Sequence, residues 1–158
     1  SWVGTFGFQA WVFRFANIIG ERGTHGVIFD FINKLNATPN RLEVLGNGLQ
    51  EKSYMEVKEC VTSILHVVEH TDLPFNLCNL GSVDTISVRQ IAETVVEETG
   101  YHDALIDYTG GDRGWAGDIP RARLAIDKLN QLGYIPSMNS KEAVRHTVRA
   151  LIKEIGLR

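Results

Sequence analysis

A tyrosine and a lysine four residues apart are the first candidates for chemistry in this sequence. Tyr54 and Lys58 have the Tyr-x-x-x-Lys spacing in which a lysine lowers the pKa of a tyrosine that then transfers a proton. This chemistry requires a helix, because a helix places positions i and i+4 on one face. The residues around Tyr54 predict a strand instead, in which four residues span roughly 13 Å. We therefore interpret the spacing as coincidental and assign no catalytic residue.

Three glycines further along the chain have a spacing associated with dinucleotide binding. Gly111, Gly114 and Gly117 fit G-x-x-G-x-x-G, and in a dinucleotide fingerprint such glycines let the backbone approach the pyrophosphate where a helix begins. Here Pro120 follows the third glycine, and no strand with a ribose-binding acid follows about 20 residues later. Roughly forty residues remain, which is too few for a doubly wound fold. We therefore expect a loop here and no cofactor site.

Histidine and cysteine spacings indicate no metal site. His66 and His70 are four residues apart at the end of an expected helix, but no cysteine or glutamate stands at metal-ligand spacing from them. Their position is typical of histidines that interact favourably with a helix dipole. Cys60 and Cys78 lie in apolar surroundings, which is typical of buried, reduced cysteines in an intracellular protein.

Composition excludes two classes of partner. Apolar residues make up 44% and charged residues 22% of the 158 residues, as is ordinary for a soluble globular protein. The net charge of -3 does not indicate the positively charged surface that nucleic-acid binding requires. The longest apolar stretch, residues 10–19, is interrupted by Arg14 and Asn17 and is too short to span a bilayer. Because no export signal is evident, we expect a cytoplasmic protein that binds neither nucleic acid nor membranes.

Strand and helix patterns alternate along the chain, which predicts an α/β fold. Residues 9–15 are mostly apolar on both faces, as in a strand buried in a parallel sheet. Ser87 and Gln90 form a capping box that begins a helix, and Gly100 ends it. The helix at 58–70 is expected to face the core with Val61, Ile64, Leu65 and Val68. Strands are expected at residues 9–15, 41–45, 50–57, 74–80 and 104–108, helices at about 27–35, 58–70, 88–99, 126–132 and 140–155, and loops at 17–26 and 110–117.

The first residues of the chain carry no helix-start signal. Residues 1–8 are mostly small and aromatic, and they hold no methionine. We expect this segment to be a cut through a longer protein rather than a natural N-terminus.

Five segments occur in the order and spacing of a known family. They are Arg14–Gly23 (R-x-x-N-x-x-G-x-x-G), Gly46–Val57 (G-x-G-x-Q), Asn76–Val88, Arg113–Pro120 and Asp127–Pro136. Together they resemble the C-terminal portion of the extended short-chain dehydrogenase/reductase family, and within it the NAD-dependent nucleotide-sugar epimerases and dehydratases that are similar to UDP-glucose 4-epimerase. The resemblance covers about residues 8–158, and it rests on the order of the segments rather than on any one of them.

The resemblance implies roles for several side chains. Asn17 would contact the diphosphate or the sugar, Arg113 would clamp the diphosphate, and Asp118 would bind a ribose hydroxyl or orient Arg113. Gln50 and Lys52 would lie by the phosphate and the sugar. The resemblance also places Leu42, Val44 and Leu45 beside the base, and Phe15 with Asn17 beside the NAD cofactor of the family.

Two departures from the family pattern affect the expected phosphate contacts. Lys52 and Ser53 stand where the family usually has Arg-Asp, so that a bidentate guanidinium and its buried partner are lost. Arg113 and Asp118 are separated by two residues more than in the family's R-P-G-D, and the intervening Trp115 can reshape the pocket. Simpler roles stay open for Arg14 as a buried, paired arginine, for Asn17 as a turn cap and for Lys52 as a solvated strand residue.

The resemblance also implies how the chain is organised. Residues 1–20 would be a remnant of the Rossmann domain, its last parallel strand and loop, and residues 21–158 would be the substrate-binding α/β domain. The family's glycine fingerprint and its Tyr-x-x-x-Lys pair lie upstream of the R-x-x-N segment, in the dinucleotide-binding half. The chain alone would therefore bind a nucleotide-sugar, preferably a UDP-sugar, but would hold no NAD and would turn nothing over.

Three hypotheses for the function stay open. The first is the substrate-binding part of an NAD-dependent epimerase or dehydratase, which acts with a Rossmann half or a partner chain. The second is a stand-alone nucleotide-sugar-binding module, and the third is a protein-interaction module that uses the strand at residues 9–15. The open edge and apolar faces of that strand predict a homo-oligomer.

Overall fold

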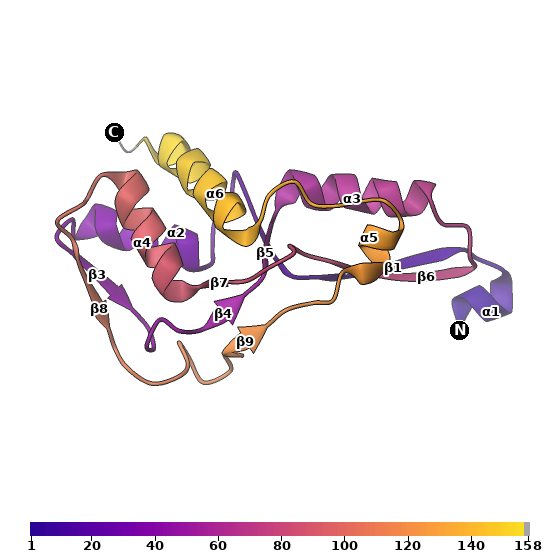
Figure 1. Cartoon of the computed structure of the whole chain (residues 1–158), viewed down its shortest axis with the longest axis horizontal. Coiled ribbons are helices and arrows are strands. Elements are labelled where there is room, and N and C mark those ends of the chain that lie inside the picture. The colour runs from indigo at the N-terminus through magenta and orange to yellow at the C-terminus, as the bar shows by residue number, and fades with distance from the viewer. Residues whose placement is uncertain (157–158) are drawn as a thin grey trace.

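Helices and strands alternate along residues 1–156, which are the residues that this computed structural model describes (Figure 1). The expected α/β class is thereby confirmed. The helices are α1 (Trp2–Phe6), α2 (Val27–Ala37), α3 (Val57–Glu69), α4 (Val88–Thr99), α5 (Asp127–Gln131) and α6 (Ser140–Ile155). The strands are β1 (Ala10–Phe15), β2 (Asn17–Ile19), β3 (Arg41–Val44), β4 (Glu51–Lys52), β5 (Tyr54–Glu56), β6 (Phe75–Leu80), β7 (Ile86–Ser87), β8 (Leu105–Tyr108) and β9 (Arg121–Ala122).

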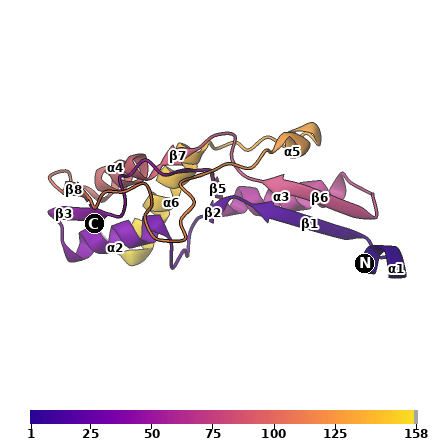
Figure 2. The same cartoon turned by 90° about the horizontal axis from the view of Figure 1, so that it is seen from below.

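Two hydrophobic cores lie towards opposite ends of an elongated molecule (Figure 1, Figure 2). The first, which we call the helical core, is enclosed by α2, α4, α6 and the parallel pair β3–β8. The second, which we call the strand core, lies between the parallel pair β1–β6 and the helices α3 and α5. The short parallel pair β2–β5 connects the two ends, with Asn17 opposite Tyr54.

The helical core forms because the apolar stripes of α2 and α4 pack on β3, while that of α6 packs on both helices and on β5. Ile32 and Leu35 of α2 and Val148 of α6 are completely buried, and each such aliphatic side chain contributes about 1.5–3 kcal/mol. The expected capping box of Ser87 begins α4, and Gly100 ends that helix with φ 78°. Within residues 1–156, no helix is long and apolar enough to cross a membrane.

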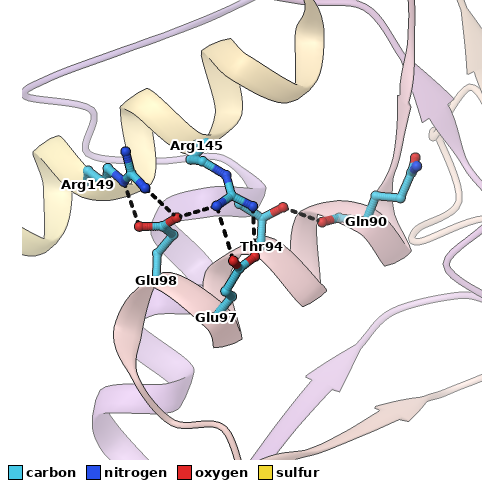
Figure 3. A network of polar contacts seen from close by, with 6 residues as sticks. All are labelled: Gln90, Thr94, Glu97, Glu98, Arg145 and Arg149. Carbon is cyan, nitrogen blue, oxygen red and sulfur yellow. Dashed lines mark hydrogen bonds and ion pairs between the residues drawn. The ribbon is translucent and has the colours of Figure 1, made fainter.

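Ion pairs join α4 to α6 at the surface of the helical core (Figure 3). Glu98 accepts hydrogen bonds from Arg149, and its carboxylate also lies 2.9 Å from Nη1 of Arg145. Glu97 accepts from Nη2 of Arg145 at 2.7 Å, and the hydrogen bond and charge of Arg145 lower the pKa of Glu97. Because exposed ion pairs add little free energy, this cluster orients α6 on α4 more than it stabilises the fold.

The strand core is covered on one face only. Phe13 of β1 lies opposite Cys78 of β6 and, like Trp11, packs against the core. Val12 points to the other face and is 42% exposed. Within residues 1–156, β6 is the only strand that pairs with β1. The prediction of a parallel strand is confirmed, and within residues 1–156 its second edge is unpaired, in agreement with the open edge that the sequence predicted.

Helix α3 packs against the strand core with a different stripe from the predicted one. Cys60 and Val67 are buried along the line where α3 meets β6 and α5, and Ile64 is partly buried beside them. The prediction of an inward position is thus confirmed for Ile64, but it is wrong for Val61, Leu65 and Val68, which are all exposed. Cys60 and Cys78 are unpaired, and burial raises the pKa of both thiols, so their expected role as buried, reduced cysteines is confirmed.

The first residues form a helix that the sequence did not predict. Helix α1 ends at Gly7, whose φ of 69° lies in the left-handed region that favours glycine. The rings of Trp2 and Phe6 contact each other at a tilt of 31°, with their centroids 5.0 Å apart, and both side chains are exposed. Helix α1 therefore has an aromatic contact between its first and last residues but no side chain that caps its N-terminus.

Two further differences have a local cause near β5. The predicted strand at 50–57 is divided into β4 and β5 and ends at Glu56, because the Glu56 carboxylate accepts hydrogen bonds from the N–H groups of Lys58 and Glu59 and caps α3. The predicted loop at 17–26 begins as β2, because residues 17–19 pair with β5.

Replacing Leu42 by alanine should lower the free energy of unfolding by about 2–5 kcal/mol, because its fully buried side chain would leave a cavity in the helical core. Leu105 lies on the neighbouring strand β8 and is 63% exposed, so Leu105→Ala is the matched control. It should change the free energy of unfolding by less than about 0.5 kcal/mol. Urea unfolding followed by circular dichroism measures both variants. Equal losses would contradict the assignment of Leu42 to the core.

Candidate functional site

A cavity of about 820 Å³ opens beside the end of β2, the loop that follows it and the first turn of α2. A second cavity of about 300 Å³ adjoins it near the end of β1. The larger volume lies within the usual range of small-molecule sites. Five residues line both cavities, and we call them the shared wall: Ala16, Asn17, Lys52, Trp115 and Asp118.

An ion pair forms the charged part of the shared wall. Nζ of Lys52 lies 2.5 Å from Oδ1 of Asp118, and the Asp118 side chain is only 8% exposed. Burial by itself would raise the pKa of Asp118, but hydrogen bonds from the Lys52 ammonium and from the N–H groups of Gly114 and Ile119 outweigh it and lower the pKa. The structure therefore brings together two of the expected site residues, as an anion held beside a cation that faces the cavity.

Gln50 supplies a buried polar group to the larger cavity. The side chain is 2% exposed, and its Nε2 donates to the backbone oxygen of Leu45 at 3.3 Å. Oε1 of Gln50 has no hydrogen-bond partner among the described residues. Gly46 makes this arrangement possible, because it has φ 82° and a Cβ there would overlap the Gln50 amide. A buried acceptor without a partner is suited to a hydroxyl or N–H donor of a ligand.

Asn17 is fixed in place by the backbone of residue 53. Both its backbone N–H and its Nδ2 donate to the oxygen of Ser53, at 3.2 and 3.1 Å. This bond orients the amide on the shared wall, at the end of the strand pair that connects the two cores. Phe15 is half exposed and lines the smaller cavity, and Leu45 is 46% exposed and lines the larger one.

The N-terminus of α2 is a candidate anion-binding element that the sequence did not predict. Its cap is Gly26, which offers no side chain to the first N–H groups of the helix, and Gly26 and Val27 line the larger cavity. Uncapped N–H groups and the helix dipole attract anions. The available signal was the set of three glycines between Gly20 and Gly26, just before the apolar stripe begins.

Three expected ligand contacts do not reach either cavity. Leu42 and Val44 are completely buried in the helical core, because the inward positions of β3 face α2 and α4. Arg113 is exposed, and its Nη1 reaches only the backbone oxygen of Ala116, at 3.4 Å. None of the three lines a cavity. The structure therefore places Leu42 and Val44 in the helical core and Arg113 at the surface, outside both cavities.

The two catalytic-looking spacings are placed as the sequence predicted. Tyr54 lies in β5 and Lys58 in α3, where Lys58 pairs with Glu21 at 3.2 Å. Burial, and to a lesser extent the charge of Asp118, raises the pKa of Tyr54 to about 12, which is the opposite of what a proton-transfer tyrosine requires. Residues 111–117 form a loop of bends and turns that begins no helix. The expected loop at this segment is thereby confirmed.

The segment that carries most of this site matches a known family. Residues 1–81, which include Asn17, Gln50 and Lys52, match the model of the NAD dependent epimerase/dehydratase family. This chain belongs to that family. The expected resemblance to the extended short-chain dehydrogenases/reductases is thereby confirmed.

Individual members of the NAD dependent epimerase/dehydratase family agree with this result. GDP-mannose 3,5-epimerase of Arabidopsis thaliana is 31% identical over 149 residues, which cover 90% of this chain and 37% of that protein. The crystal structure of a UDP-galactose 4-epimerase has a TM-score of 0.84 at 38% identity, covering 98% of this chain and 49% of the other. A UDP-glucose 4-epimerase from Thermotoga maritima, solved with UDP-glucose, has a TM-score of 0.81 at 25% identity, covering 97% and 49%. The fold is thus the Rossmann-like epimerase fold, and the chain spans half or less of the length of these relatives.

Replacing Asp118 by asparagine should destabilise the protein in a pH-dependent way. Because the folded state lowers the pKa of Asp118, the ion pair stabilises the fold at pH values above the unfolded pKa of about 3.9 and is lost as the pH falls through the lower folded value. We expect Asp118→Asn to lower the free energy of unfolding by about 1–2 kcal/mol near neutral pH, between the values for exposed and buried pairs.

Urea unfolding at a series of pH values measures this difference between wild type and Asp118→Asn, which should shrink below about pH 4. Asp107→Asn is the matched control, because Asp107 also pairs at 2.5 Å, but with the exposed Arg41. Asp107→Asn should lower the free energy of unfolding by less than Asp118→Asn does. A loss for Asp118→Asn that is the same at every pH would contradict the ion-pair assignment.

Proposed function

We propose that this chain is the nucleotide-sugar-binding part of an NAD-dependent epimerase or dehydratase and that a dinucleotide-binding half supplies the cofactor and the catalytic residues. The observation that carries this proposal is the shared wall. A lysine, an amide and a carboxylate meet there between two adjoining cavities, in a segment that matches the family. A nucleotide-sugar has its charge in the middle and a neutral group at each end, so a charged wall between two cavities suits it.

The diphosphate would lie between Lys52 and the N-terminus of α2. Both line the larger cavity, and a phosphate accepts hydrogen bonds from an ammonium and from uncapped backbone N–H groups. Asn17 would add a donor from its amide, while Asp118 would accept from a ribose hydroxyl. Gln50 would offer its unpartnered Oε1 to a donor on the nucleoside, beside Leu45 at the base. The proposed ligand contacts therefore include only those expected site residues that line a cavity, and they leave out Leu42, Val44 and Arg113.

The complementary half of the enzyme would pair with the open side of the strand core. We propose that residues 1–20 belong structurally to the Rossmann domain and that residues 21–158 form the substrate-binding domain. In support, β1 has an unpaired edge within the described part of the chain, and parallel sheets are normally covered on both faces. Phe15 and Asn17 would then contact an NAD molecule that the other half holds. The alternative is a stand-alone nucleotide-sugar-binding or protein-interaction module, and the open edge of β1 supports the latter.

Isothermal titration calorimetry with UDP-galactose, UDP-glucose and GDP-mannose tests the binding role. We expect at least one of them to bind weakly, UDP to bind as well, and uridine to fail because it lacks the diphosphate. Lys52→Met should weaken binding about tenfold, since a hydrogen bond to a charged group is lost. Lys141 of α6 is exposed and lines neither cavity, so Lys141→Met is the matched control. The proposal would be contradicted if none of the three nucleotide-sugars gave a binding isotherm, or if the two lysine variants changed the affinity equally.

Multi-angle light scattering at low micromolar concentration tests the open sheet. We expect a dimer or a higher oligomer, because an unpaired strand edge beside exposed apolar side chains favours association. Val12→Lys places a charge on the uncovered face of β1 and should shift the population towards monomer. Leu105→Lys changes an equally apolar, exposed position on β8, far along the chain from β1, and should leave the oligomer unchanged. A monomeric wild-type protein would contradict this expectation.

A further inference from the structure

We propose that Trp115 contacts the ligand directly and packs its indole against the C–H face of a sugar ring, either the ribose or the hexose of the nucleotide-sugar. This inference rests on the proposed function and adds a specificity-determining residue to it. Trp115 replaces Arg113, which the sequence analysis placed at the ligand, as the functional side chain of the 110–117 loop.

The position of Trp115 in the site is the first observation. Of the three tryptophans in the sequence, it alone lines the cavities, and it lines both of them. Its side chain is 67% exposed, so most of the indole has no protein neighbour. A large aromatic side chain that is left open on a cavity wall is suited to cover an apolar surface of a ligand.

The second observation is that the chain backbone is shaped to hold the ring there. The benzo part of the Trp115 indole lies so close to Gly117 that a Cβ at residue 117 would overlap it. The N–H of Asp118 also donates to the backbone oxygen of Trp115 at 3.0 Å, which closes the turn between them. The absence of a side chain at Gly117 therefore gives the indole its place beside the shared wall.

The spacing of the loop agrees with this assignment. In the R-P-G-D pattern the arginine stands three residues before the aspartate, and three residues before Asp118 stands Trp115. Arg113 stands five residues before it and has its guanidinium on the backbone of Ala116, outside the cavities. At the position where the pattern has a cation, this chain therefore presents an aromatic surface, and Lys52 is left as the cationic side chain of the shared wall.

The chemistry of the wall points to a sugar ring as the group that is contacted. A sugar ring carries hydroxyl groups around its edge and C–H groups on its faces. Asp118 lies on the same wall as Trp115 and can accept hydrogen bonds from hydroxyl groups at the edge. The indole can then cover a face of the same ring without competing for those hydrogen bonds.

Calorimetry and tryptophan fluorescence on the same samples test the inference. With UDP-galactose or whichever nucleotide-sugar the chain binds, Trp115→Ala should weaken binding about fivefold to tenfold, the range of an aromatic contact. Trp115→Phe should retain most of the affinity, because a ring remains. Gly117→Ala should weaken binding like Trp115→Ala, because it displaces the indole without removing it. Trp2 is 66% exposed but lines neither cavity, so Trp2→Ala is the matched control and should bind normally.

Fluorescence identifies which sugar is contacted. Ligand binding should change the emission of the wild-type protein and of Trp2→Ala, but not that of Trp115→Phe. If the ribose is contacted, UDP changes the emission as much as the nucleotide-sugar does, whereas a contact with the hexose requires the complete ligand. Calorimetric binding with unchanged emission and unchanged affinity in Trp115→Ala would overturn the inference and leave the proposed function standing. No calorimetric binding by the wild type would overturn both.

Discussion

Every polar group of Ser53 makes a hydrogen bond to a distant segment, and the site depends on these bonds. Its N–H donates to Ala122 at 3.2 Å, and its backbone oxygen accepts both donors of Asn17. Its hydroxyl accepts from the N–H of Ser82 at 3.0 Å. Ser53 is 2% exposed, so an unmade bond here would leave a buried polar group without a partner, at a cost of about 1–3 kcal/mol. Residues that are 29 to 69 positions away from Ser53 in the sequence thus meet at one residue.

The elements around the cavities follow from this junction. Lys52 precedes Ser53 directly, so the register of β4 against β9 sets where the ammonium enters the shared wall. Asn17 is held by the backbone oxygen of the same residue, which fixes β2 and the start of the loop that leads to α2. Where the family usually has Arg-Asp, this chain has Lys52 and Ser53, and the acidic partner of the cation comes from Asp118 instead. Asp118 supplies from another segment the carboxylate that residue 53 lacks.

Some of the site could be predicted from the sequence, and the failures have physical reasons. Gln50, Lys52, Asn17 and Asp118 line the larger cavity, and the sequence could indicate them because family segments give both their types and their order. Leu42 and Val44 were misplaced because alternation along a short strand predicts which residues share a face, but not whether that face meets helices or a ligand. The arginine at 113 was matched by residue type although the spacing from Asp118 points to Trp115.

The N-terminus of α2 was missed because its donors belong to the backbone and leave no side-chain signature. The α/β class and the capping boxes were predicted because they depend on local patterns.

The division of the apolar residues into two cores places the larger cavity between two separately packed ends. The strand pair β2–β5 that connects the cores is three residues long on each side, and both α3 and α6 contact it. The larger cavity takes one wall from α2, which packs in the helical core, and residue 18 on its lining packs in the strand core. The larger cavity is therefore bounded by both ends of the molecule, so a ligand that fills it contacts residues that belong to both cores.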